Sequence, residues 1–236
     1  MTGPARVRAV LIGSGKMGRA VEALASDHGV DVTAVLGRGD RIDAAALGGA
    51  DVAIEFTEPG AALGNLRACA AAGCPVVVGT TGWGGPSAAL GAELAAARAR
   101  ALWAANFSLG VNALLGAIGQ LAAALAGAGF APHLIETHHA AKKDAPSGTA
   151  IALAAATGLD PAPAITSVRV GSVPGTHTLL FDAPFEQVRV THEARDRRVF
   201  ASGALVAARW LAAPRAPGLY SMQDVLAPAG ASEVTA

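Results

Sequence analysis

Apolar residues in the first hundred positions gather in short runs, separated by alanine- and leucine-rich stretches with helical spacing. The runs are rich in valine and isoleucine, which favour strands, and most end in residues typical of turns. Short apolar strands that alternate with helices build a parallel sheet with helices on both faces. We therefore predict a doubly wound α/β fold with strands at Val7–Gly13, Asp31–Gly37, Asp51–Thr57, Pro75–Thr81 and Ala101–Asn106.

The pattern changes after Asn106. A long apolar helix is followed by the strand "HLIETHH", a short helix that opens at Ser147, and three β-type runs within residues 164–194. Helical spacing then resumes in "VFASGALVAARWLAAP", and the chain ends near "GLYSMQDVL". We expect this tail to return to the first domain, so that residues 1–107 and 198–236 form one domain and residues 108–197 a second, α+β domain.

One segment, Leu109–Phe130, is apolar enough to resemble a membrane span. Asn112, Gln120 and several glycines interrupt it, and no basic flank marks a cytoplasmic side. We predict a buried helix and no membrane contact. The start "MTGPARVRAVLIG" lacks the apolar stretch of a leader peptide, so we expect a cytoplasmic protein.

Charge and cysteine content narrow the classes of ligand. Eighteen basic side chains balance eighteen acidic ones, whereas a nucleic-acid-binding protein normally carries a basic excess. We therefore expect a small-molecule ligand and no nucleic acid. Cys69 and Cys74 have neither zinc-site nor disulfide-framework spacing, which favours buried thiols in a reducing compartment.

The segment "LIGSGKMGRA" has GxGxxG spacing at Gly13, Gly15 and Gly18, directly after a strand and at the opening of a helix. The glycines allow a tight turn, close approach of a pyrophosphate and tight helix–strand packing, which is the Rossmann pattern. A plain glycine-rich turn is the alternative. We predict dinucleotide binding by the residues of this turn, Ile12, Gly13, Ser14, Gly15, Lys16 and Met17.

The second strand ends in "VLGRGD", where a dinucleotide-binding protein often has an acidic residue for the ribose 2′-hydroxyl. Gly37 removes that carboxylate, and Arg38 offers a charged partner for a 2′-phosphate. The sequence therefore favours NADPH over NADH. In the alternative, Arg38 is simply solvated and Asp40 takes the place of the acidic residue.

Two further strands end in "VVVGTTG" and "AANFSLG", at the edge where open α/β sheets bind ligands. Ordinary strand-to-helix turns are the alternative for both. We predict that the nicotinamide end of the cofactor is lined by Gly79, Thr80, Thr81, Ala104, Ala105, Asn106 and Phe107.

Polar residues cluster in "IETHHAAKKDAPSGTAIAL". His138 and His139 end a predicted strand, so their side chains point to opposite faces and at least one is exposed or functional. Lys142 and the Ser147–Thr149 helix start add a cation, two hydroxyls and free amides, which together suit an anionic ligand. Metal binding by the two histidines is the rival, but adjacent strand residues diverge and no other ligand has the right spacing, so we expect no metal.

Together these motifs resemble the dihydrodipicolinate reductase family over nearly the whole chain. The likeness rests on "GSGKMG", "VGTTG", "AANFSLGVN" and above all "ETHHAAKKDAPSGTA". The resemblance implies NAD(P)H-dependent reduction of 4-hydroxy-tetrahydrodipicolinate, a dicarboxylate, in diaminopimelate and lysine synthesis, by a homotetramer. It also implies that His138 donates a proton, that Lys142 is a catalytic or substrate-anchoring residue, and that the substrate is further bound by His139, Ser147, Gly148 and Thr149.

Two features depart from the family pattern. Gly37 stands where many members have an acidic residue, and the segment around Leu159–Ala164 is short. A non-catalytic dinucleotide sensor would keep the glycine turn, but we would expect it to lose polar residues of the second domain, and this chain retains them. A dehydrogenase acting on aspartate or a sugar would share the first domain, but would not explain the His-His-x-x-Lys pattern.

Overall fold

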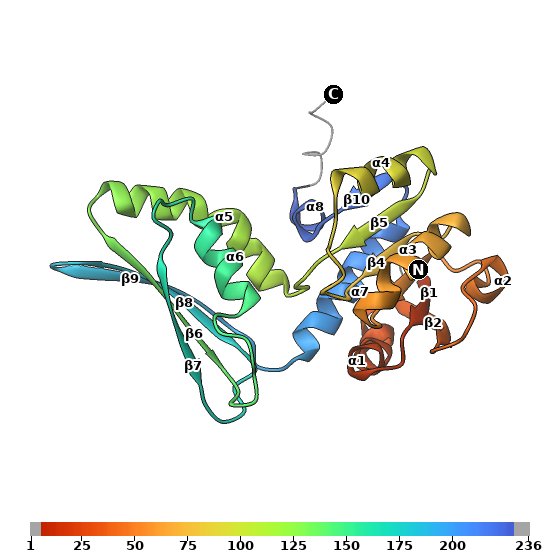
Figure 1. Cartoon of the computed structure of the whole chain (residues 1–236), viewed down its shortest axis with the longest axis horizontal. Coiled ribbons are helices and arrows are strands. Elements are labelled where there is room, and N and C mark those ends of the chain that lie inside the picture. Colours follow the sequence, from red (N-terminus) through yellow and green to blue (C-terminus); the bar gives the residue numbers. More distant parts are fainter. Residues whose placement is uncertain (1–5, 229–236) are drawn as a thin grey trace, which may run out of the picture. The chain divides into compact units, whose positions relative to one another are not determined.

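The computed structural model describes residues 6–228 and divides the chain into two compact units. One unit holds the residues up to Ser108 and those from Phe200 onward, and the other spans Leu109–Val199. Each unit has its own sheet and its own apolar core (Figure 1). Residues 1–5, on which the expectation of no leader partly rests, and residues 229–236 lie outside the described part.

The first unit contains a six-stranded sheet with the order β10-β5-β4-β3-β1-β2, in which every pairing is parallel. All five strands predicted for the first hundred residues are present, and the predicted doubly wound class is confirmed. The sixth strand comes from the tail, which returns to pair with β5. The strands are β1 (Val7–Ile12), β2 (Val30–Leu36), β3 (Val52–Glu55), β4 (Val76–Val78), β5 (Arg100–Trp103) and β10 (Gly218–Tyr220).

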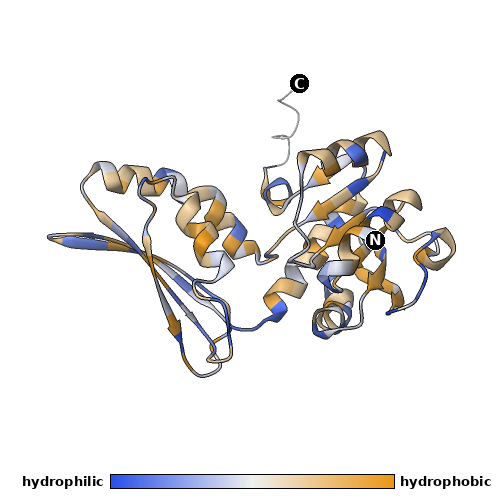
Figure 2. Ribbon diagram, in the orientation of Figure 1, coloured by the Kyte–Doolittle hydropathy of each residue, from blue (hydrophilic) through white to orange (hydrophobic). Residues whose placement is uncertain are grey.

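Both faces of this sheet are buried. Side chains alternate along a strand, so Val10 and Ala53 face one layer while Ala9 and Ile54 face the other, and all four are inaccessible to solvent. The central strands are accordingly apolar along most of their length (Figure 2), apart from Arg8 in β1 and Glu55 at the end of β3. The connecting helices are α1 (Lys16–Ala25), the 3-10 turn η1 (Ser26–His28), α2 (Ala44–Leu47), α3 (Pro59–Ala71), α4 (Ala88–Ala96), α7 (Arg198–Ala212) and α8 (Met222–Leu226).

The second unit is a four-stranded mixed sheet with the order β7-β6-β8-β9. β6 (Ala131–His138) pairs in parallel with β7 (Ala164–Arg169) and antiparallel with β8 (Thr176–Ala183). β9 (Glu186–Glu193) completes a hairpin with β8. Two helices, α5 (Leu109–Gly127) and α6 (Gly148–Ala156), join Leu134, Leu179 and Phe181 in a core on one face of the sheet.

Helix α5 differs from the prediction of a buried helix. By length and composition it is apolar enough to cross a membrane, a criterion that core helices of soluble proteins also meet. Only 22% of its apolar window is buried within the described chain. The buried positions are Val111, Asn112, Ile118 and Ala122, because the helix packs on α6 and the sheet along one side only.

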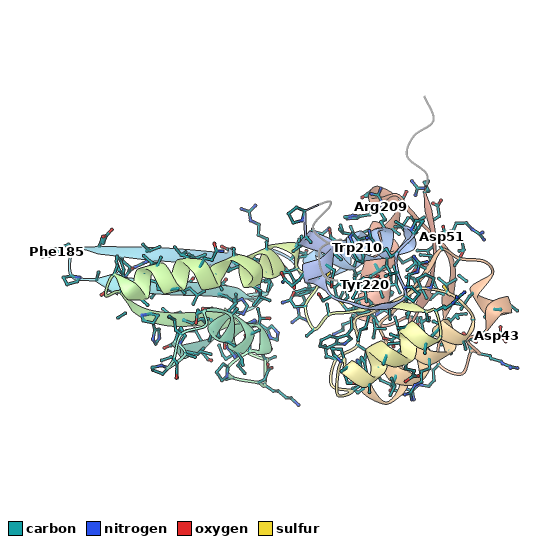
Figure 3. All side chains as sticks on the ribbon, turned by 90° about the horizontal axis from the view of Figure 1, so that it is seen from above. Asp43, Asp51, Phe185, Arg209, Trp210 and Tyr220 are labelled. Atoms are coloured by element: carbon teal, nitrogen blue, oxygen red, sulfur yellow. The ribbon has the colours of Figure 1, made fainter. Side chains whose placement is uncertain are left out.

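The second face of the four-stranded sheet carries side chains of mixed polarity. Ile135 on β6 lies between Thr166 on β7 and Thr178 on β8, and Thr178 in turn faces Thr191 on β9. Val168 is partly exposed, and Phe185 at the tip of the β8–β9 hairpin is fully exposed (Figure 3). In the described part of this unit, the helices pack on the opposite face.

Candidate active site

The glycine turn of the first unit has the geometry of a phosphate-binding loop. A Cβ at Gly13, whose φ is +109°, would lie 2.0 Å from the Phe56 carbonyl oxygen, and a Cβ at Gly18 would lie 2.0 Å from the Gly13 carbonyl oxygen. A Cβ at Gly15 would meet nothing within 4 Å. Gly13 and Gly18 therefore shape the turn, whereas Gly15 leaves open space in front of it.

The same turn opens helix α1 and leaves its amides available. Gly15 is the N-cap, no side chain caps the helix, and no acidic residue lies in its first turn. The first amides of a helix have no partner within the helix and carry its positive end. Ser14 and Lys16 beside them are exposed, Met17 is half-buried and Ile12 is buried in the strand. These residues fit a dinucleotide pyrophosphate.

The turn after β4 is largely occupied by contacts within the protein. A Cβ at Gly79 would lie 1.9 Å from the Phe56 ring, so close packing explains this glycine. The Thr80 hydroxyl accepts from the Thr57 amide at 2.8 Å, and the Thr80 carbonyl accepts from the indoles of Trp83 and Trp103. Thr81 alone of the three predicted residues is exposed.

The turn after β5 is also well packed. Phe107 is 2% exposed and meets Phe56 edge to face at 5.9 Å, so its ring is a core contact. The Asn106 side chain accepts from the Ser108 amide at 2.8 Å. Ala104 is buried and Ala105 exposed. Of the residues predicted to line the nicotinamide in these two turns, Thr81 and Ala105 are the exposed ones.

At the end of β2, both residues of the cofactor question, Arg38 and Asp40, already have partners within the protein. The Arg38 side chain is 86% exposed and pairs with Glu58 at 2.9 Å. Asp40 accepts a hydrogen bond from the Gly37 amide at 2.7 Å. A 2′-phosphate at Arg38 would therefore compete with an exposed carboxylate, which holds the arginine only weakly in water.

Glu55, at the end of β3, was not predicted from the sequence to be a site residue. It is fully buried, it lies in register between Ile12 and Val78, and it accepts hydrogen bonds from Thr57 and Asn65. Its Oε2 is buried without a hydrogen-bond partner among the described residues. Its position as the single acid within the apolar run "VAIEF" was the available signal.

In the second unit, His138 is the last residue of β6, and it is buried. Its Nδ1 is hydrogen-bonded to the Glu136 carboxylate, which is also fully buried. The other Glu136 oxygen accepts from Arg169 Nη2 at 2.7 Å. The His177 ring lies edge to face with the His138 ring, 5.2 Å between centroids. The predicted proton donor is thus part of a network of four polar side chains.

Burial and charge set the protonation of this network. Burial opposes ionisation of Glu136, but hydrogen bonds from Arg169, Ser167 and His138 outweigh it and lower its pKa to about 2. Burial, together with the positive charges of Lys142 and Arg169, lowers the pKa of His138 even though Glu136 raises it. Burial and the neighbouring histidines lower the pKa of His177 to about 4. Near neutral pH the carboxylate is therefore charged and both rings are predominantly neutral.

His139 and Lys142 lie just beyond the strand. The His139 Nε2 accepts from Arg197 Nη2 at 2.6 Å, since an arginine can only donate. The Lys142 ammonium contacts both oxygens of Asp144 at 2.8 Å, and this lowers the pKa of the Asp144 carboxyl. Arg197 is a cation that the sequence reasoning missed, and no spacing rule connects it with His139.

The predicted anion site lies at the start of helix α6. Ser147 is its N-cap and accepts from the Ala150 amide at 3.1 Å, while its hydroxyl also contacts His177 Nε2 at 3.2 Å. Gly148 is exposed, and a Cβ there would meet nothing within 4 Å. Thr149 is half-buried. The Ser147 hydroxyl is thus already engaged, and the open space at this helix start lies at Gly148.

Ligand atoms of Glu136, His138 and His177 lie within 4.8 Å of one another, as in a metal site. Both Glu136 oxygens are engaged, one by an arginine, so a metal would have to displace a cation from its salt bridge. This donor set fits an internal hydrogen-bond network better than a metal. The absence of a metal nevertheless stays a prediction.

A Rossmann-type unit with an open glycine turn, together with a mixed-sheet unit that holds a buried histidine network, defines a nucleotide-dependent oxidoreductase. Both halves of the chain match one family. Residues 7–107 match the model described as "Dihydrodipicolinate reductase, N-terminus", and residues 110–226 match "Dihydrodipicolinate reductase, C-terminus". The chain belongs to the dihydrodipicolinate reductase family, as the sequence motifs predicted.

Individual relatives agree over nearly their whole length. The 4-hydroxy-tetrahydrodipicolinate reductase of Thiobacillus denitrificans is 41% identical, over 93% of this chain and 98% of the relative. That of Acidiphilium cryptum is 38% identical, over 90% and 94%. A dipicolinate-bound dihydrodipicolinate reductase from Paenisporosarcina sp. TG-14 has the same fold, with a TM-score of 0.74 at 22% identity, over 92% of this chain and 97% of that one.

Proposed function

We propose that this chain catalyses the NAD(P)H-dependent reduction of 4-hydroxy-tetrahydrodipicolinate, by way of dihydrodipicolinate, to tetrahydrodipicolinate in diaminopimelate and lysine synthesis. The family supports this assignment, and relatives that carry the reductase name match over nearly the whole chain. The observation that carries it furthest is the buried His138, bonded to Glu136 in the strand that leads into Lys142 and helix α6.

A bound reduced nicotinamide supplies a hydride. The hydride leaves negative charge on a conjugated substrate, and a general acid must then deliver a proton. His138 suits this role because an imidazole exchanges protons near neutral pH. Its ring is predominantly neutral in the free protein, so it must gain a proton before it can act, and a bound dianionic substrate favours that step by raising the pKa of the ring.

The substrate carboxylates require cations and donors in a partly desolvated site. We assign this role to His139, Lys142 and the first turn of α6, at Ser147, Gly148 and Thr149. Lys142 already pairs with the exposed Asp144, so a substrate carboxylate would exchange with that partner. Arg197 adds a second cation next to His139.

The direct test is the oxidation of NADPH, followed by absorbance, with substrate freshly made from aspartate semialdehyde and pyruvate. We expect turnover that depends on both condensation partners. Oxidation that proceeds equally without pyruvate would contradict the proposed substrate. A control with His138→Gln should show only the background rate.

We also propose a preference for NADPH over NADH. Gly37 offers no carboxylate to the ribose, and the exposed Arg38 offers a cation to the 2′-phosphate. We expect about a tenfold preference in kcat/KM that shrinks as salt screens the pair. Arg38→Ala should reduce NADPH use selectively, whereas Arg41→Ala, a nearby exposed arginine, should not. Better use of NADH by the wild-type enzyme at low salt would instead implicate Asp40.

The oligomeric state and location belong to the same proposal. The family resemblance supports a homotetramer, and we expect the second face of the four-stranded sheet, with Ile135, Val168 and its threonines, to form a subunit contact. Native mass spectrometry would distinguish a tetramer from a monomer. The cytoplasmic location, the small-molecule ligand and the absence of nucleic-acid and membrane partners remain predictions from the sequence.

A further inference from the structure

Strand register builds a row of polar residues across the second sheet. Glu136 on β6 lies opposite Ser167 on β7 and opposite His177 on β8, and His177 lies opposite His192 on β9. His138, two residues after Glu136, shares its face of the strand and lies opposite Arg169. The carboxylate therefore lies among polar side chains of three strands, it is hydrogen-bonded to residues of β6 and β7, and it is 0% exposed.

The two Glu136 oxygens have different partners. The contact of one of them with His138 determines which ring nitrogen carries the hydrogen. One oxygen accepts from Arg169, which also donates to the Asp144 carbonyl at 2.6 Å, and the other contacts His138 Nδ1. An ionised carboxylate can only accept, so Nδ1 must carry the hydrogen. Only Nε2 then remains for proton exchange with a ligand.

Gly175 lies close to that remaining nitrogen. A Cβ at this position would lie 3.0 Å from His138 Nε2, and its φ of +155° is a conformation that side-chain-bearing residues rarely adopt. The glycine therefore leaves the approach to Nε2 uncovered by any side chain of its own. Nδ1, next to Glu136, and Nε2, next to Gly175, lie on opposite sides of the ring.

We propose that Glu136 is a positioning residue for His138, which fixes the ring with its hydrogen on Nδ1, aims Nε2 at the substrate and stabilises the imidazolium that donates the proton. Arg169 holds the carboxylate in place. The inference rests on the proposed function, in which His138 is the general acid. It assigns the buried Glu-Arg pair to catalysis rather than to folding alone.

The charges around His138 define what removal of Glu136 should do. Glu136 on β6 is the anion that contacts the ring, Lys142 and Arg169 are cations that disfavour the imidazolium, and His177 on β8 is predominantly neutral. Loss of the carboxylate charge removes the anion that contacts the ring, while both cations stay in place. The pKa of His138 should then fall by about one unit or more.

Nitrogen-15 NMR of histidine-labelled full-length protein, without substrate, tests the positioning directly. The chain has six histidines, and His138→Gln assigns the signal. We expect the Nδ1–H form in the wild type, and a lower pKa with loss of that form in Glu136→Gln. The exposed Glu186→Gln serves as control and should leave the signal unchanged. An Nε2–H form in the wild type would overturn the proposal, and that measurement requires no variant to fold.

Steady-state kinetics provides a second test of the positioning role of Glu136. The alkaline limb of the kcat profile, where His138 loses its proton, should move down by about one pH unit in Glu136→Gln, with kcat at neutral pH reduced about tenfold. Glu136→Asp keeps the negative charge. It should therefore have a higher kcat than Glu136→Gln and a smaller shift of the alkaline limb. A fall in kcat with unchanged His138 tautomer, pKa and pH limb would mean that Glu136 is structural only. Inactivity of the wild type itself would refute the proposed function while leaving the NMR result to stand.

Discussion

The two units differ in whether their polar groups are exposed or buried. In the first unit, the turn between β1 and α1 has open space in front of Gly15 and no side chain that caps the helix. In the second unit, ionisable side chains are buried and bonded to one another around His138. The first arrangement suits a ligand that brings its own charge, and the second suits a group that must move a proton.

This difference determines which substitutions should be informative. On the proposed function, the backbone of the first unit does most of the binding, so changes of shape there should matter more than changes of charge. On the same proposal, side chains of the second unit perform the chemistry, so changes of charge there should alter the rate without a large change of shape. Four experiments test this contrast.

The largest effect should come from His138→Gln. We expect kcat to fall on the order of 10²-fold or more, because a general acid contributes at least that much, while the KM for either ligand changes little. Steady-state kinetics measures both parameters. A kcat close to that of the wild type would remove His138 from the mechanism.

Two substitutions in the glycine turn should separate an effect on folding from an effect on cofactor binding. Gly13→Ala forces a Cβ to within 2.0 Å of the Phe56 carbonyl oxygen at a positive φ, so we expect a loss of about 3 kcal/mol in the free energy of unfolding. Gly15→Ala meets open space and should fold normally, but its methyl group should raise the Kd for NADPH several-fold. Urea titration and calorimetry measure the two quantities. Equal stability of both variants would contradict the assignment of Gly13 to the turn.

Lys142→Ala should impair both kcat and the substrate KM. It removes a cation that faces a substrate carboxylate, which we expect to reduce kcat/KM by about 2 kcal/mol, or about thirtyfold. The neighbouring exposed Lys143→Ala is a matched control and should stay near wild type. An effect confined to the KM for the nicotinamide would mean that the assignment of Lys142 to the substrate site is wrong.

The smallest effect concerns acid stability. The pKa of His177 falls from 6.5 to about 4 on folding, so between these values the unfolded chain binds the proton and the folded chain does not. Stability should therefore fall as the pH drops from about 6.5 to about 4, at up to about 1.4 kcal/mol per pH unit for this group. His177→Gln should weaken this slope, whereas His28→Gln in the first unit should not.

Urea unfolding at several pH values measures this slope, and two probes separate the units. All three tryptophans, Trp83, Trp103 and Trp210, lie in the first unit, so their fluorescence reports that unit alone. Far-UV circular dichroism reports both units. A slope of equal size in His177→Gln would refute the assignment to His177.

Much of the architecture could be predicted from local patterns. The apolar runs identified every strand of the first sheet up to β5, and Ser147 was correctly predicted to open a helix, because these features depend on neighbours in the chain. Helix α5 was predicted to be buried, but its composition gives no information about how many sides are covered.

The polar network around His138 was harder to predict. Arg169 and His177 reach Glu136 through strand register, which the sequence does not encode locally. Glu136 itself could have been found, since it lies two residues before His138 and thus on the same face of the strand. Thr80 and Phe107 were predicted to line a ligand, but their groups are engaged in internal contacts, which only three-dimensional packing shows.

The return of the chain to its first sheet has a consequence for biosynthesis. Strand β10 and the buried residues of α7, including Leu205 and Leu211, complete the first unit, but they leave the ribosome only after the whole second unit. The second unit is continuous in sequence and can fold as soon as it emerges. The unit that begins first on the ribosome is therefore the last to be finished, and its apolar sheet edge must meanwhile be kept from associating with other nascent chains.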